Sequence, residues 1–189
     1  MSKVINVVFS PRKNGNCADA ATYNKNILNK KGYQVETIYL YDYDINPCGN
    51  CDYHCFKEGN CNIDDDVYSI YQKLMGADYI MYYIPTFAGH LSSMYFMFHE
   101  REQGIFSDND HEYNHAYMKK IHIIVIGNSI AGGDLALTEA LSSFKNMYQP
   151  ETLLLSSRDY NASSIKGNLI NNDDVKHRLN LFVNRVIKV

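Results

Sequence analysis

Residues 8–17, with the sequence VFSPRKNGNC, constrain the fold of this chain more than any other segment. They continue the apolar run at residues 4–9, whose length and β-branched side chains are typical of a buried strand. They lead into residues 18–28, which we interpret as a helix. A strand that passes through a short polar loop into a helix places unpaired backbone N–H groups at the positive end of the helix dipole. The segment therefore predicts an anion site best suited to phosphate, and its alternative is an ordinary strand–helix turn capped by asparagine.

The residue types in this loop suit a phosphate. Hydroxyl, amide and cationic side chains donate to phosphate oxygens, and glycine lets the backbone approach closely. The loop supplies these groups in Ser10, Arg12, Lys13, Asn14, Gly15 and Asn16. It matches neither the G-x-G-x-x-G pattern of dinucleotide-binding turns nor the G-x-x-x-x-G-K-[ST] pattern of nucleoside-triphosphate loops. We therefore expect a phosphate loop of another kind.

The rest of the chain alternates between apolar runs and segments with helical patterns. Further strands are predicted at 33–40, 78–84, 121–126 and 152–155, and further helices at 67–74, 92–101, 135–148 and 173–187. This alternation predicts a single domain over residues 1–189 with a three-layer α/β fold. Its centre would be a five-stranded parallel sheet of order 2-1-3-4-5, with helices on both faces.

Three loops of the predicted fold are rich in glycine, asparagine and serine, and they follow the first, third and fourth strands. They cover residues 10–17, 85–90 and 127–133. The carboxyl ends of parallel strands lie at one edge of a sheet, and ligands of such sheets bind there, near the point where the strand order reverses. The three loops are therefore expected to meet between the first and third strands.

Composition excludes several classes of function. The net charge of −3 gives no electrostatic footprint for nucleic acid or an anionic membrane. No apolar run approaches the ~20 residues of a membrane span, and no signal peptide is apparent. Five cysteines, mostly within one short segment, favour a cytoplasmic metal or redox role over a secreted disulfide framework.

The loop at residues 10–17 resembles the S-P-R-x-x-G-N-[ST] loop of the NADPH-dependent FMN reductase family, which cradles the FMN phosphate within a flavodoxin-like fold. Residues 47–66 are similar to the family block P-C-x-x-C … G-x-C-x-x-x-D-D. Residues 77–101 resemble A-D-x-[IV] … P-[IV]-Y-x-G-x-[LMI]-S … D-R, and residues 127–134 resemble the glycine-rich turn after the fourth strand. The likeness covers nearly the whole chain and lies near the iron–sulfur flavoprotein branch of the family.

This resemblance implies a site and a chemistry. The residues implied to bind FMN are Ser10, Arg12, Asn14, Asn16, Cys17, Pro85, Thr86, Phe87, Ala88, Gly89, Asn128 and Gly132. The implied activity is an FMN-dependent oxidoreductase that takes electrons from NAD(P)H to a small acceptor such as a quinone or free flavin. The family also implies a homodimer. The chain departs from the family pattern at Cys17, at Thr86-Phe87, at Phe96 and at Glu100, which bears on the acceptor more than on FMN.

The most distinctive constellation is C-x2-C-x3-C-x5-C, formed by Cys48, Cys51, Cys55 and Cys61. Four thiolates this close can hold a [4Fe–4S] cluster, and the iron–sulfur branch has a similarly compact motif. Here the third cysteine lies one position late, and His54 occupies its usual place. Tetrahedral zinc or reduced thiols without metal are the alternatives. We expect FMN without a stable cluster. The alternative function is a non-enzymatic flavin or iron–sulfur electron carrier, or a cysteine-based redox or metal sensor.

Residues 111–115 match H-E-x-x-H, the zinc-protease motif, which requires a helix that carries both histidines on one face. The surrounding residues are polar and lack helical apolar periodicity, so we interpret the match as chance. Residues 102–120 contain few apolar residues to anchor them, and we expect them to be mobile or to face another subunit. His122, within a predicted strand, is expected to be a core or interface residue.

Overall fold

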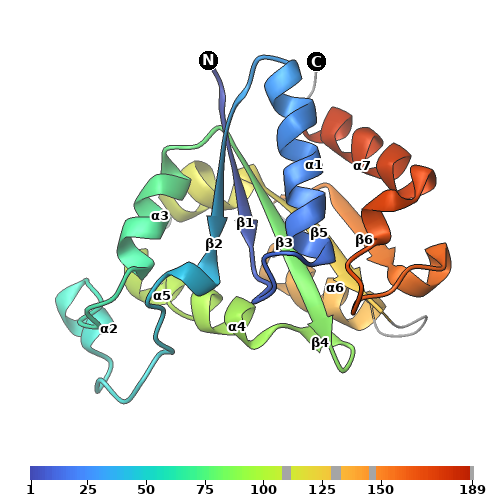
Figure 1. Cartoon of the computed structure of the whole chain (residues 1–189). Helices are drawn as coiled ribbons and strands as arrows, with labels where there is room; N and C mark the ends of the chain where they lie inside the picture. The colour runs from blue at the N-terminus through green and yellow to red at the C-terminus, as the bar shows by residue number, and fades with distance from the viewer. Residues whose placement is uncertain (108–111, 129–132, 145–147, 188–189) are drawn as a thin grey trace.

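The computed structural model describes residues 1–107, 112–128, 133–144 and 148–187. Its centre is a sheet of order β2-β1-β3-β5-β6, in which neighbouring strands are parallel (Figure 1). These strands are β1 (Lys3–Val8), β2 (Gln34–Tyr39), β3 (Tyr79–Phe87), β5 (Ile121–Gly127) and β6 (Thr152–Ser156). Taken in chain order, they follow the predicted 2-1-3-4-5 arrangement, so the predicted α/β sheet is confirmed.

A short antiparallel strand, β4 (His90–Leu91), pairs with the carboxyl end of β3 and was not predicted. The two-residue turn between them consists of Ala88 and Gly89, whose φ angles are +50° and +89°. Two successive positive φ angles are typical of the tight turns whose twist matches antiparallel strands. A strand of two residues is too short to show a periodic pattern. Gly89 was therefore the only sequence signal for this hairpin.

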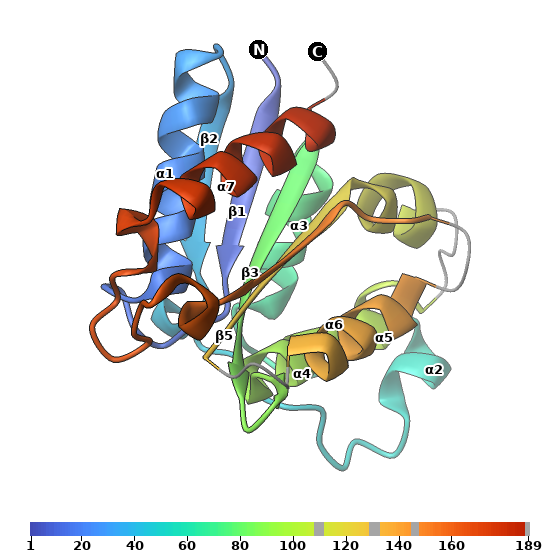
Figure 2. The ribbon, with the colours of Figure 1, turned by 90° about the vertical axis from the view of Figure 1, so that its right-hand side faces the viewer.

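The helices cover both faces of the sheet, as predicted. They are α1 (Asn16–Lys30), α2 (His54–Glu58), α3 (Val67–Met75), α4 (Ser93–His99), α5 (Glu102–Ile105), α6 (Gly133–Leu141) and α7 (Asp173–Val186). Helices α1 and α7 pack on one face, and α3, α4 and α6 pack on the other (Figure 2). The predicted helix at 135–148 is shorter in the structure, because α6 ends at Leu141 and a 3₁₀ turn (Ser142–Phe144) follows.

Helix α7 illustrates how sequence determines these elements. The Asn172 side chain accepts hydrogen bonds from the backbone N–H groups of Asp174 and Val175, which satisfies donors that have no partner within the helix. Apolar residues then recur at helical spacing at Val175, Leu179, Phe182, Val183 and Val186, and all of them are buried. This stripe lies against β6 and α1 and closes one face of the core.

The expectation that residues 102–120 lack apolar anchoring is wrong for the part of the segment that the structure describes, whereas its alternative, that they face another subunit, stays a prediction. Glu102, Phe106, Tyr117 and Met118 are buried, and the three apolar ones belong to the main core cluster. Glu112–Tyr117 form a π-helical turn, which places Tyr113 and Tyr117 against Phe106. Aromatic residues too few to form a periodic pattern thus anchor the segment. His111, which belongs to the H-E-x-x-H match, lies outside the described residues.

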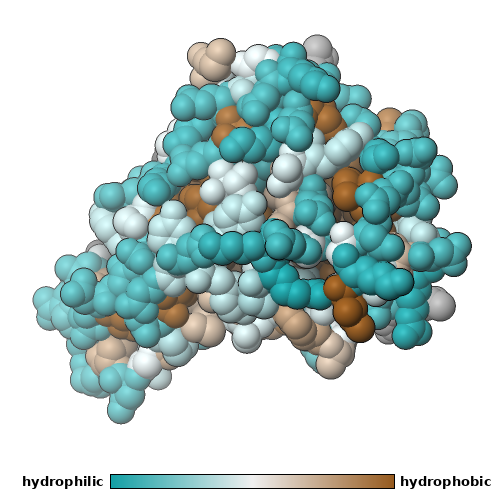
Figure 3. All heavy atoms as spheres, viewed as in Figure 1, coloured by the Kyte–Doolittle hydropathy of each residue, from teal (hydrophilic) through white to brown (hydrophobic). Residues whose placement is uncertain are grey.

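Within the described ranges, no helix is both long and apolar enough to cross a membrane. The face seen in Figure 3 is mainly hydrophilic, and its hydrophobic residues show as small separate groups. The carboxyl ends of the strands lie at the lower side of Figure 1, opposite both chain termini. The loops of the predicted site therefore meet at that end of the molecule.

Candidate functional site

The loop between β1 and α1 lies at the carboxyl edge of the sheet and has an uncapped helix start. Gly15, the residue before α1, has an extended backbone, and no side chain caps the helix there. The first N–H groups of α1 consequently have no side-chain acceptor, as expected of an anion site. Ser10 is buried at the start of the loop, where its Oγ accepts a hydrogen bond from the Arg12 backbone N–H at 3.3 Å.

Asn16 has a structural role that the sequence did not reveal. Its Nδ2 donates to Ser157 Oγ at 3.1 Å, and its Oδ1 accepts from the Leu169 backbone N–H at 3.1 Å. Ser157 in turn donates to the Gly127 carbonyl at 3.2 Å. The buried Asn16–Ser157 pair therefore joins the loops that follow β1, β5 and β6. The side-chain amide of Asn16 has two N–H groups, and this network uses one of them.

The charged residues of the loop are exposed and differ in what they contact. The Arg12 guanidinium donates to the Ser164 carbonyl, whereas Lys13 forms an ion pair with Asp42 at 2.7 Å. Asn14 is exposed. Its carbonyl is so close to Gly167 that a Cβ there would lie 2.7 Å from the oxygen, and the Gly167 φ of +63° also favours glycine. Residues 163–168 thus pack directly against the anion loop, and no sequence motif predicts this contact.

The end of β3 and the turn that follows it approach the same place. Pro85 is buried, Thr86 is half-buried, and Phe87 is 51% exposed beside the turn formed by Ala88 and Gly89. A Cβ on Gly127 would lie 3.0 Å from Thr86 Oγ1, so the ends of β3 and β5 meet as closely as glycine permits. Asn128 follows Gly127 and is exposed, whereas Gly132 lies outside the described residues.

Glu139 of α6 holds the β3–β4 hairpin in position. Its carboxylate contacts His90 Nδ1 at 2.7 Å and accepts the Leu91 backbone N–H at 3.0 Å. The hydrogen bonds from His90 and from the Leu91 N–H lower the pKa of Glu139 below its ordinary value, and they outweigh burial, which alone would raise it. The turn that carries Phe87 is therefore fixed from the helix layer.

Cys17, at the start of α1, is buried, and this burial raises the pKa of its thiol to about 12. A thiol this hard to ionise is a poor nucleophile and a weak hydrogen-bond donor. Its packing against the core suits a small apolar residue, which fits the replacement of the threonine usual in the family.

The four remaining cysteines line one small cavity. Cys48 and Cys51 precede α2, Cys55 lies within it, and Cys61 follows it. Gly104 of α5 closes the cavity, because a Cβ there would lie 3.0 Å from Cys61 Cβ and 3.5 Å from Cys55 Cβ. His54 does not line this cavity. Helix α2 lies beside α5, outside the layers that cover the sheet (Figure 2).

A single metal ion has no ready site in this cavity. Within the described residues, which include all five cysteines, no three or more His, Cys, Asp or Glu side chains are arranged to hold one. A [4Fe–4S] cluster places its thiolates farther apart than a single ion does, since four irons lie between them. Four thiols are a donor set that both [4Fe–4S] clusters and zinc take in proteins.

Arg101 ties this segment to the rest of the fold. Its guanidinium donates to both Asp65 oxygens, to the Asn46 carbonyl at 2.8 Å and to Cys61 Sγ at 3.3 Å. Burial alone would raise the pKa of Asp65, but hydrogen bonds from Arg101 and from the backbone N–H groups of Asn46 and Val67 outweigh it and lower the pKa. The ion pair therefore stays charged inside the protein.

His122 lies in β5, half-buried, and its Nδ1 accepts the Glu151 backbone N–H at 3.2 Å. This hydrogen bond links β5 to the segment that leads into β6, and His122 is not part of either core cluster, so its expected role as a core or interface residue stays a prediction. The assignment of the carboxyl-edge loop residues to FMN stays a prediction. The assignment of the four cysteines to a metal also stays a prediction.

Comparison with known proteins identifies relatives of two kinds. The sequence profile described as NADPH-dependent FMN reductase matches residues 2–158. An iron–sulfur flavoprotein of Methanocaldococcus jannaschii is 36% identical over 101 residues, 53% of this chain and 52% of the relative. An iron–sulfur flavoprotein of Methanosarcina thermophila is 30% identical over 88 residues, 47% of this chain and 46% of the relative. These matches span about half the length of either relative.

Solved structures share the fold at low sequence identity. The Trp repressor binding protein of Bacillus subtilis has a TM-score of 0.63 and 15% identity, with 93% of this chain and 94% of that chain covered. The flavoenzyme NAD(P)H:acceptor oxidoreductase of Paracoccus denitrificans has a TM-score of 0.59 and 15% identity, with 100% and 98% covered. The predicted flavodoxin-like fold is thereby confirmed.

Proposed function

The chain belongs to the NADPH-dependent FMN reductase family, and we propose that it binds FMN and passes reducing equivalents from NAD(P)H to a small acceptor. The observation that carries this proposal is the joining of three carboxyl-edge loops at the uncapped start of α1. Asn16, Ser157 and Gly127 link them through buried hydrogen bonds. Ligands of open parallel sheets bind at this edge.

The proposed phosphate site uses the N–H groups at the start of α1 together with side chains of the preceding loop. Asn14 and the Arg12 guanidinium are exposed beside that helix start, so both can reach an anion. Ser10 shapes the loop through its bond to the Arg12 N–H. The site suits a single terminal phosphate, because no dinucleotide pattern follows.

The proposed ring site lies at the ends of β3 and β5. Backbone from Pro85 to Gly89 would edge the polar side of the ring, and Asn128 would approach it from the neighbouring loop. Half of the Phe87 side chain is exposed, so its ring is available to pack on a flat ligand. Glu139 contributes by fixing the hairpin, and Thr86 by packing against Gly127.

Bound FMN would supply the hydride chemistry, while the protein supplies binding, orientation and access to one ring face. The departures from the family pattern at Thr86 and Phe87 lie at the end of β3, where we propose that the ring binds, and the departure at Phe96 lies on α4. Because the exposed Phe87 ring can pack on a flat molecule, we expect an acceptor that is itself flat, such as a quinone.

Steady-state oxidation of NADH and NADPH by the purified, FMN-loaded protein tests this proposal. We expect turnover with a quinone or free flavin as acceptor, and binding of FMN in preference to FAD. Absence of turnover with any acceptor, in protein that retains FMN, would instead support a carrier or sensor. Tighter binding of FAD than FMN would contradict the single-phosphate site.

A second candidate function is iron–sulfur electron transfer, and one observation favours it. Although the third cysteine is displaced in sequence, all four cysteines line the same cavity. The curated relatives named above are iron–sulfur flavoproteins. A cluster would supply one-electron transfer, and Cys48, Cys51, Cys55 and Cys61 would hold it. Arg101, within hydrogen-bonding distance of Cys61 Sγ, would balance the negative charge of the thiolates.

A further inference from the structure

A cavity of about 610 Å³ lies on the helical face of the protein that carries α4 and α5. Its lining includes Phe56, His99, Glu100, Glu102, Phe106 and Ser143. None of them belongs to the carboxyl-edge loops proposed to bind FMN. The cavity is large enough for a small organic molecule and combines aromatic walls with a few polar groups, as ligand sites commonly do.

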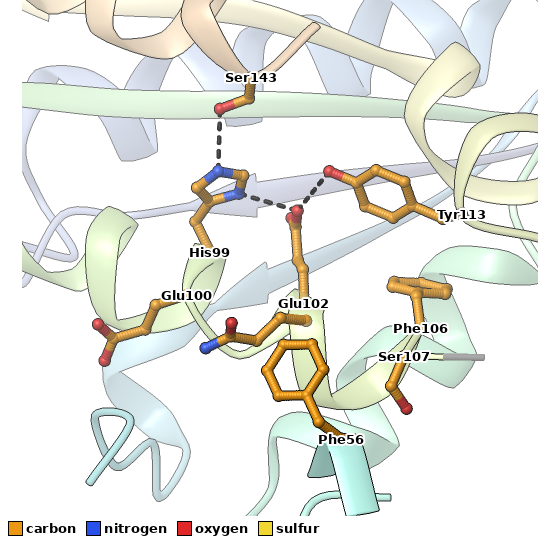
Figure 4. A pocket seen from close by; sticks show the side chains of 9 residues that line it. Phe56, His99, Glu100, Glu102, Phe106, Ser107, Tyr113 and Ser143 are labelled. Carbon is orange, nitrogen blue, oxygen red and sulfur yellow. Dashed lines mark hydrogen bonds and ion pairs between the residues drawn. The ribbon is translucent and has the colours of Figure 1, made fainter. Parts of the chain in front are cut away.

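Three of these residues form a hydrogen-bonded chain of serine, histidine and carboxylate (Figure 4). Ser143 Oγ lies 2.9 Å from His99 Nε2, and His99 Nδ1 lies 2.9 Å from Glu102 Oε2. They come from separate elements, because His99 ends α4, Glu102 begins α5 and Ser143 lies in the 3₁₀ turn after α6. The order of contacts is that of a nucleophile, a base and the group that orients the base.

Glu102 is held in place by three tyrosines. Tyr117 and Tyr71 donate to its Oε1 at 2.7 and 3.2 Å, and Tyr113 donates to Oε2 at 2.9 Å. With His99 as a fourth partner, both carboxylate oxygens are satisfied in a side chain that is only 7% exposed. This carboxylate holds the imidazole with Nδ1 toward Glu102 and Nε2 toward the Ser143 hydroxyl, the orientation in which Nε2 can accept the serine proton.

His99 is correspondingly adapted to accept a proton. Burial alone would lower the pKa of its imidazole, but the hydrogen bond and the charge of Glu102 outweigh this and raise it. The imidazole is also stacked on the Tyr95 ring, with 5.5 Å between the ring centroids, which restricts its orientation.

We propose that Ser143, His99 and Glu102 form a second, hydrolytic site that cleaves small esters with an aromatic group. The rings of Phe56 and Phe106 wall the cavity and would contact that group. Glu100 at the cavity makes anionic esters poor ligands, so the expected substrates are neutral or cationic.

The reaction balances without any further reagent. Ser143 Oγ attacks the ester carbonyl carbon while its proton passes to His99 Nε2. The ester C–O bond then breaks, and the departing alcohol takes the proton from His99. Water next attacks the acyl-serine with His99 again accepting a proton, so that the carboxylic acid leaves and Ser143 regains its hydrogen.

Covalent labelling tests the proposal directly. The FMN-loaded protein is treated with a fluorophosphonate probe, the labelled residue is identified by mass spectrometry, and hydrolysis of 4-nitrophenyl acetate is followed in parallel. We expect labelling of Ser143. Ser143→Ala should abolish it and lower the hydrolysis rate by about 10²-fold or more, and His99→Gln should lower the rate by about 10²–10⁴-fold.

Ser142→Ala is the matched control, since Ser142 lies in the same turn and bonds only to the Glu139 carbonyl of its own helix among the contacts described. It should keep both label and rate. Flavin absorbance and circular dichroism establish that each variant is folded. A label on another residue, an unchanged rate in Ser143→Ala, or no label and no hydrolysis in folded wild type would each overturn the proposal.

Discussion

Arg101 and Asp65 form an ion pair inside the protein, with 2.6 Å between Nη1 and Oδ2 and side chains 2% and 1% exposed. The two residues belong to separate sequence motifs. Asp65 lies at the end of the cysteine segment, and Arg101 lies between α4 and α5. The ion pair joins these two motifs and brings the Arg101 guanidinium to Cys61. The cysteine cavity therefore depends on the Arg101–Asp65 ion pair, which neither motif predicts when it is taken alone.

Replacing one member of this pair should strongly destabilise the protein. Arg101→Met leaves the Asp65 carboxylate buried without its cation, which is expected to lower the free energy of unfolding by about 3–5 kcal/mol. Urea unfolding at neutral pH measures this loss. Adding Asp65→Asn to Arg101→Met should recover part of it, because the orphaned charge is removed. The exposed pair Lys176–Asp173 is the control, and Lys176→Met should cause no measurable change.

The pH dependence of this stability follows from the lowered pKa of Asp65. Its folded pKa lies below its unfolded value, so the contribution is present above the unfolded pKa of about 3.9 and is lost as pH falls through the folded pKa. Wild type should therefore lose stability below about pH 4 more steeply than Asp65→Asn. Parallel curves for the two proteins would contradict this.

Arg12→Ala should weaken FMN binding by about 1–3 kcal/mol, through loss of a charge-assisted hydrogen bond to phosphate. Lys13→Ala is the matched control, because Lys13 is already paired with Asp42. Fluorescence titration of the flavin-free protein gives both affinities. Equal losses for the two variants would indicate a diffuse charge effect in place of a phosphate contact.

Asn16→Ala separates structural from ligand contacts. It removes the acceptor of the buried Leu169 N–H and the donor to Ser157, which should cost about 1–3 kcal/mol of stability in flavin-free protein. FMN affinity should fall as the three loops lose their link. If flavin-free stability were unchanged while affinity fell, Asn16 would be a direct phosphate ligand instead.

The His99 imidazole should titrate above its ordinary value of 6.5, as followed by NMR. Glu102→Gln should lower the pKa, because the opposing charge is lost. The stabilisation from this pair is fully present below the unfolded pKa of about 6.5 and is lost as pH rises through the folded pKa. A His99 pKa at or below 6.5 in wild type would show that Glu102 does not stabilise the charged form.

The cysteine cavity can be tested by iron and sulfide analysis after anaerobic isolation. If it binds a cluster, as the second candidate function requires, about four irons per chain are expected, and Cys55→Ser should lose them. Cys17→Ala should retain the iron, since Cys17 lies in the core and not at the cavity. Iron-free protein with four reactive thiols would agree with the expectation from sequence.

The sequence predicted the sheet well, because buried parallel strands such as β1 and β5 are continuous apolar runs. It also located the loops at the carboxyl edge, since glycine and asparagine mark them. It missed β4, which is too short for a pattern, and the aromatic anchoring by Phe106 and Tyr117. It missed Ser157 as well. A serine after a strand does not by itself predict a functional role, and only the folded structure shows that Ser157 bonds to Asn16.

Contacts that are remote in sequence could not be predicted from local patterns. The Ser143–His99 hydrogen bond spans 44 residues, and the Asn16–Ser157 bond spans 141. No periodicity or motif spacing encodes such distances. They follow only from the order of the strands, which the sequence predicted, and from the lengths of the loops, which it did not resolve.

The Asn16–Leu169 hydrogen bond, which spans 153 residues, has a consequence for biosynthesis. Asn16 in the anion loop leaves the ribosome 141 residues before Ser157 and 153 residues before Leu169. Domains emerge from the N-terminal end during synthesis, and pairings of high contact order form slowly. The loop therefore stays incompletely ordered until Leu169 has been translated, and the proposed phosphate site is completed only when that late contact forms.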